Sequence, residues 1–139
     1  MLHRHFDAPP EEVFAAFTDA QLVKKWLGSK DHPLEDAQIE AVPGGRIRQV
    51  WGGDPGTLLT GEVLQVDPPH RIVHSARSSE TPATGETVVD IRLVPEGPGT
   101  VMWMEIAYRD ETGREAAMGS PMAEGMELAF GRLDQLLAG

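Results

Sequence analysis

The chain has 139 residues, no cysteine and a formal net charge of −10, with 22 acidic and 12 basic residues. This length suits one domain with one hydrophobic core, and the absence of cysteine excludes disulfides, thiolate metal ligands and cysteine nucleophiles. Acidic residues scattered along the chain repel phosphate backbones and anionic lipids, so we predict neither a nucleic acid nor a membrane as a partner.

The N-terminal part predicts a short strand and then two short helices. Leu2–Phe6 has the length of an edge strand. Pro10 can open a helix, because the first helical position needs no N–H group. Thr18–Gln21 has the spacing of a capping box, so a second helix is expected over residues 19–26, ending at Gly28. The apolar faces of the two helices consist of Val13, Phe14, Phe17, Leu22, Val23, Trp26 and Leu27.

The middle of the chain predicts consecutive strands after a polar loop at residues 29–37. Clusters of glycine, proline and aspartate separate segments with strand-like alternation. Because these connections are short, the strands are expected to pair antiparallel. The predicted strands cover residues 37–41, 46–51, 57–66, 71–77, 87–94 and 100–108.

The C-terminal part predicts one long helix from about Ser120 to Ala138, after a lead-in at residues 110–119. Ser120 can cap this helix, and Pro121 occupies the first helical position. A helix with one apolar face needs a surface to cover, and a curved sheet supplies it. The sequence therefore predicts an α+β fold, with a seven-stranded antiparallel sheet around this helix. The apolar stripe consists of Met122, Met126, Ala129, Phe130, Leu133 and Leu137.

A series of short motifs runs along the chain in a fixed order. They are Arg4–Pro9, Val13–Asp19, Leu22 with Trp26, Pro43–Arg48, Gly61–Val63, Pro68–Val73, Gly99 with Thr100, and Gly125–Leu133. The ordered set resembles the START-like (SRPBCC) superfamily, with the helix-grip fold of Bet v allergens. Within it, the chain is similar to bacterial homologues of the activator of the heat-shock-protein-ninety ATPase. The resemblance implies one helix-grip domain over residues 1–139, but no single activity, because the superfamily hosts carriers, cyclases, hydrolases and binding proteins.

The chain differs from the pattern of this family at two positions. Members commonly have tryptophan where this chain has Met126, and an aromatic residue where it has His74. Strand alternation and helical periodicity place both side chains toward the space between sheet and helix. The resemblance therefore implies a cavity that is wider and more polar than is usual.

We expect this cavity to have a volume on the order of a few hundred Å³. Strand alternation places Met102, Met104 and Tyr108 on one face, and methionine adapts to pockets of variable shape. The alternative is that the methionines only pack the core. The predicted ligand-binding residues are Trp26, Gln49, Trp51, His74, Met102, Met104, Tyr108, Met122, Met126 and Phe130.

No residue is predicted to be catalytic or to hold a metal or cofactor. His74 has the chemistry of an acid, a base or a hydrogen-bond donor, but the favoured interpretation is a core histidine paired with Tyr108 or Gln49. His3 and His5 face one side of a strand without further ligands of a zinc pattern. The glycine pairs match turns and not a phosphate-binding loop.

Trp103 lies on the strand face opposite to the methionines. On a sheet with one covered face, this position meets solvent, so the sequence predicts a surface for a homodimer. The alternative is a single exposed aromatic residue beneath Arg92.

The leading functional prediction is a binding domain for a small apolar or amphipathic molecule. One alternative is an enzyme of the cyclase or hydratase kind, with Tyr108, His74 or Gln49 transferring protons. Another is an interaction module that stimulates a chaperone ATPase. Eukaryotic activators carry an additional N-terminal domain that these 139 residues lack, which favours ligand binding. No segment has the pattern of a membrane span or signal peptide, so a cytoplasmic location is expected.

Overall fold

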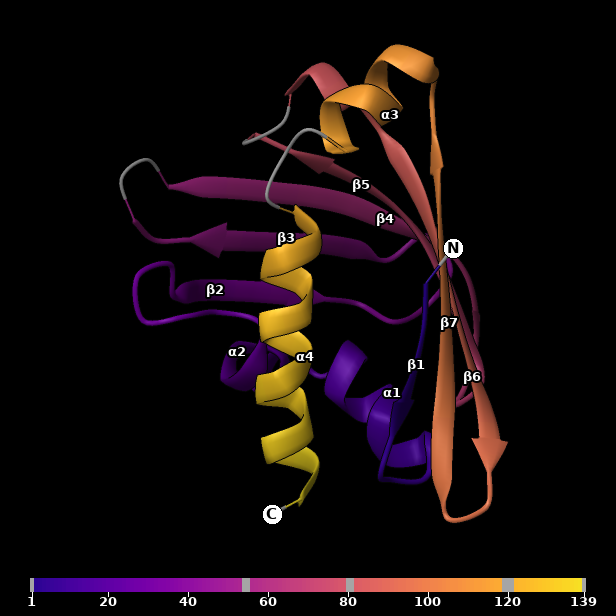
Figure 1. Cartoon of the computed structure of the whole chain (residues 1–139). Helices are drawn as coiled ribbons and strands as arrows, with labels where there is room; N and C mark the ends of the chain where they lie inside the picture. The colour runs from indigo at the N-terminus through magenta and orange to yellow at the C-terminus, as the bar shows by residue number, and fades with distance from the viewer. Residues whose placement is uncertain (1, 54–55, 80–81, 119–121, 139) are drawn as a thin grey trace.

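One antiparallel sheet of seven strands forms most of the protein, and its strand order is β1-β7-β6-β5-β4-β3-β2. The computed structural model describes residues 2–53, 56–79, 82–118 and 122–138. Figure 1 shows the sheet curving behind the long C-terminal helix. The strands are β1 (Leu2–Phe6), β2 (Leu34–Ile39), β3 (Arg46–Trp51), β4 (Thr57–Asp67), β5 (Arg71–Ser78), β6 (Thr87–Glu96) and β7 (Gly99–Tyr108).

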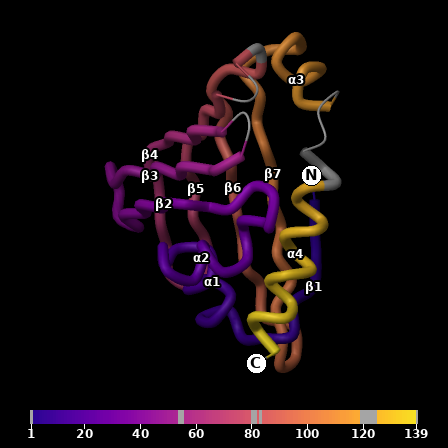
Figure 2. Tube along the Cα trace, turned by 90° about the vertical axis from the view of Figure 1, so that its left-hand side faces the viewer, coloured from indigo at the N-terminus to yellow at the C-terminus, as the bar shows by residue number. Residues whose placement is uncertain are grey.

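The helices lie on the concave side and at the two ends of the sheet. The long helix α4 (Met122–Ala138) crosses the concave side, with α1 (Pro10–Thr18) and α2 (Ala20–Trp26) near its C-terminal end (Figures 1 and 2). The short helix η1 (Pro82–Thr84) and helix α3 (Glu111–Met118) lie at the opposite end. The predicted fold, a seven-stranded antiparallel sheet around the last helix, is confirmed. None of the described helices is long and apolar enough to cross a membrane.

Helix α3 differs from the sequence prediction, which treats residues 110–119 as a lead-in. The side chain of Asp110 accepts a hydrogen bond from the backbone N–H of Gly113 at 2.7 Å. The residues that α3 buries are Gly113 and Ala117, which are too small to show an apolar stripe in the sequence. The predicted cap and first turn at Ser120 and Pro121 lie outside the described residues.

Two element boundaries also differ from the prediction. Strand β2 begins at Leu34, three positions before the predicted residue 37, because Leu34 pairs with Trp51 across a register shift. Helix α2 is capped by Asp19, whose carboxylate accepts from the backbone N–H of Gln21 at 2.9 Å. Thr18 instead donates to the Phe14 carbonyl at 2.8 Å, so the capping motif begins one residue later than predicted.

Trp26 connects the N-terminal helices to α4. Its indole N–H donates to the Ala16 carbonyl at 2.8 Å, and its own carbonyl accepts from Arg132 Nε of α4 at 2.8 Å. Its ring stacks on Phe130 at a centroid distance of 6.2 Å, and Phe130 meets Phe6 of β1 edge-on at 5.8 Å. These contacts hold α4 against one end of the sheet, and the space beside them becomes the site described next.

Candidate functional site

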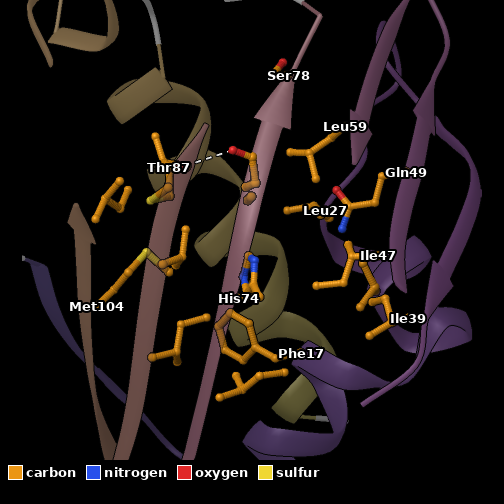
Figure 3. A pocket seen from close by; sticks show the side chains of 18 of the residues that line it. Phe17, Leu27, Ile39, Ile47, Gln49, Leu59, His74, Ser78, Thr87 and Met104 are labelled. Atoms are coloured by element: carbon orange, nitrogen blue, oxygen red, sulfur yellow. Dashed lines mark hydrogen bonds between the residues drawn. The ribbon is translucent and has the colours of Figure 1, made fainter. Parts of the chain in front are cut away.

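A pocket with a volume of about 270 Å³ lies between α4 and the concave face of the sheet. Figure 3 shows side chains from β3, β4, β5 and the N-terminal helices pointing into this space. Along each strand, inward-facing positions alternate with outward-facing ones, and mainly apolar residues occupy the inward-facing positions. The apolar lining residues are Phe17, Val23, Trp26, Leu27, Ile39, Ile47, Leu59, Ile72, Ala76, Val89, Ile91, Met104, Ile106, Ala117, Met126, Ala129 and Phe130.

The structure brings together most of the residues predicted to bind a ligand. The predicted residues that line the pocket are Trp26, Gln49, His74, Met104, Tyr108, Met126 and Phe130. Met102 does not line it, since it is fully buried in the core two residues before Met104. Trp51, at the end of β3, is also outside the lining, and the side chain of Met122 lies outside the described residues. That these residues bind a ligand stays a prediction.

The pocket also contains residues that sequence reasoning did not select. Phe17, which the sequence places on the apolar face of the first helix, lines the pocket and meets Trp26 edge-on at 5.1 Å. Ile106, which strand alternation places on the same face as Met104 and Tyr108, also lines the pocket. Thr84 had no such signal, because it belongs to η1, in a segment predicted to be a loop.

His74 is the most informative polar group in the pocket. Its Nδ1 lies 2.9 Å from the carbonyl oxygen of Ser75, which can only accept a hydrogen bond. Nδ1 therefore carries the proton. Burial lowers the pKa of His74 below its ordinary value of 6.5, so the ring is neutral at pH 7. The partner of His74 is the adjacent backbone, and not Tyr108 or Gln49.

Gln49 and Thr84 are further polar residues at the pocket whose side chains have no partner among the described residues. The Gln49 side chain is 9% exposed and makes no hydrogen bond to any described residue. The hydroxyl of Thr84 is buried and likewise unpaired among the described residues. Thr87 differs, because its hydroxyl donates to the Ala76 carbonyl at 3.3 Å (Figure 3). Buried polar groups without a protein partner are expected to bind water or a ligand.

The lowered pKa of His74 predicts a pH-dependent loss of stability. At pH values well above 6.5 the ring is neutral in the folded and the unfolded chain, and it contributes no pH dependence. As the pH falls below 6.5, the unfolded chain takes up the proton first, so the free energy of unfolding decreases by at most about 1.4 kcal/mol per pH unit.

Urea unfolding at pH 7.5 and at pH 5.5 measures this effect. A His74→Phe variant should lose less stability between the two pH values than the natural chain. His5→Phe, which changes an exposed histidine on β1, should behave like the natural chain. Equal pH dependence of the natural chain and the His74→Phe variant would contradict the assignment.

The remaining candidate sites stay apart from the pocket. Within the described ranges, no group of three or more histidine, aspartate or glutamate side chains could hold a metal ion. Trp103 is 39% exposed on the outer face of β7, and its ring lies 4.9 Å from that of His3. Self-association through this face stays a prediction.

Comparisons with known proteins agree with this fold. The sequence model of the Activator of Hsp90 ATPase homolog 1-like proteins matches residues 7–138. A crystal structure of a protein from Rhodobacter sphaeroides is 39% identical, with 99% of this chain and 90% of that chain covered and a TM-score of 0.91. A protein from Mesorhizobium loti is 28% identical over 99% of this chain and 94% of its own, with a TM-score of 0.77. None of the curated proteins compared with the chain matches it.

Proposed function

The chain belongs to the family of Activator of Hsp90 ATPase homolog 1-like proteins, and we propose that it binds a small, largely apolar molecule in the pocket between α4 and the sheet. The pocket of about 270 Å³, with no charged side chain among its described lining residues, carries this proposal. An apolar cavity of about 150 Å³ takes up benzene, so this pocket suits a molecule about the size of two fused aromatic rings. Burial of apolar surface would provide most of the affinity.

The proposal also explains why polar side chains occur within an apolar lining. Gln49, His74 and Thr84 come from three different elements, β3, β5 and η1, and all border the pocket. A few polar groups in an apolar pocket typically fix the orientation of a ligand. A protein core that served packing alone would gain stability from apolar residues at these positions.

Filling the pocket should weaken or abolish binding. Ala76 on β5 lines the pocket, and leucine at this position would occupy part of the space, so we expect naphthalene to bind about tenfold more weakly to the Ala76→Leu variant or not at all. Isothermal titration calorimetry of naphthalene with each variant measures the affinity.

The matched control is Ala107→Leu, because Ala107 lies on β7 but is exposed. This variant should bind naphthalene like the natural chain, and circular dichroism should show that both variants are folded. Equal binding by the two variants would contradict the pocket as the binding site. An interaction module without a ligand predicts that naphthalene binds to neither.

A further inference from the structure

His74 offers the pocket a hydrogen-bond acceptor that no described residue of the protein uses. Because its Nδ1–H donates to the Ser75 carbonyl at 2.9 Å, the other ring nitrogen, Nε2, has a free lone pair in the neutral ring. The lowered pKa keeps this form dominant at neutral pH. Nε2 makes no hydrogen bond to any residue of the described chain, and the imidazole borders the pocket.

The hydrogen bond that keeps the proton on Nδ1 of His74 depends on a close contact between β4 and β5. The hydroxyl of Ser75 accepts from the backbone N–H of Glu62 on β4 at 3.0 Å. Gly61, the residue before Glu62, allows the Ser75 carbonyl to approach closely, since a Cβ atom there would collide with that oxygen. Gly61 and Glu62 on β4 and Ser75 on β5 thus hold in place the carbonyl that accepts the hydrogen bond from the imidazole N–H.

Gln49 supplies the complementary group. Its amide is almost completely buried and has no partner in the described chain, so it offers both a donor and an acceptor. Figure 3 shows Gln49 on β3 and His74 on β5 pointing into the same space. One hydroxyl group can donate a hydrogen bond to a bare nitrogen and accept one from an amide N–H at the same time.

The described lining of the pocket holds no permanently cationic side chain that would neutralise an anionic ligand. It contains no lysine or arginine, and the whole chain carries a net charge of −10. Burying a carboxylate without a cationic partner is strongly unfavourable. A ligand with an ether or a ketone as its only polar group would bring a second acceptor to Nε2 and would leave this atom unpaired.

We propose that the pocket selects neutral, largely apolar molecules that end in a hydroxyl group, with the hydroxyl donating to His74 Nε2 and accepting from the amide of Gln49. This selectivity rests on the binding function proposed above.

Three probes of similar size and different polar groups test the selectivity. We expect 2-naphthol to bind about three- to tenfold more tightly than 2-methoxynaphthalene, which has no donor. The anion 2-naphthoate should bind at least about tenfold more weakly than either. Calorimetric titrations at pH 7.5 measure the three affinities.

A His74→Phe variant provides the decisive comparison. Its ratio of affinities for 2-naphthol and 2-methoxynaphthalene should fall to about one, while 2-methoxynaphthalene still binds, because phenylalanine keeps a ring but offers no acceptor. His5→Phe should keep the ratio of the natural chain. The ¹⁵N NMR spectrum should show Nδ1 protonated and Nε2 bare, and only 2-naphthol should shift the Nε2 signal.

The outcomes separate the two proposals. If none of the probes binds, both the binding function and the selectivity proposed from it are contradicted. If 2-naphthol and 2-methoxynaphthalene bind equally well, or if His74→Phe keeps the ratio of the natural chain, the binding function stands and the selectivity is overturned. A protonated Nε2 in the free protein at pH 7.5 would overturn it as well.

Discussion

Replacing Gly61 with alanine should destabilise the protein by about 3 kcal/mol or more, whereas the same change at Gly131 should stabilise it by about 1 kcal/mol. Gly61 lies in β4, paired with Ile47 of β3, and a Cβ atom at this position would collide with the backbone carbonyl of Ser75 on β5. A backbone atom held in a sheet cannot move aside as a flexible side chain can. Relieving the collision therefore requires β4 and β5 to separate.

Gly131 is the matched control, since it undergoes the same chemical change inside α4. No atom lies within 4 Å of the position that a Cβ atom would take there. Alanine loses less backbone entropy than glycine when it folds into a helix, so the substitution should raise the free energy of unfolding. Urea unfolding monitored by circular dichroism measures both variants. A Gly61→Ala variant as stable as the natural chain would show that β4 and β5 are not packed as described.

Truncating Leu133 to alanine should cost about 2–5 kcal/mol of the free energy of unfolding. Leu133 on α4 is 0% exposed and belongs to the core cluster with Phe6 and Phe130. The loss combines the burial energy of the missing carbon atoms with the cavity they leave. Helix α4 also forms one wall of the pocket. A shift of this helix in the Leu133→Ala variant should therefore weaken naphthalene binding as well.

Leu128→Ala provides the control on the same helix. Leu128 is 67% exposed, so its truncation should change stability by no more than about 0.5 kcal/mol. The same urea titrations measure this pair of variants. Similar losses for Leu133 and Leu128 would contradict the orientation of α4 against the sheet.

The sequence determined the fold through patterns that extend over a few residues. Turn residues such as Pro43 and Gly44 mark the ends of strands, and the spacing of Met126, Phe130 and Leu133 places one face of the last helix against the sheet. Alternation also predicted correctly that His74 faces inward, because the side-chain period of a strand does not depend on its partners. These features are local, so they can be recognised without knowing which strands pair.

Only the tertiary structure decided where the pocket ends and what its polar groups do. Met102 and Met104 share a strand face, but only Met104 borders the pocket, whereas Met102 is fully buried in the core. The partner of His74 is the Ser75 carbonyl, whose position depends on the contact between β4 and β5. Such facts follow from contacts between residues far apart in the chain, and the spacing of residues within one strand or helix carries no information about them.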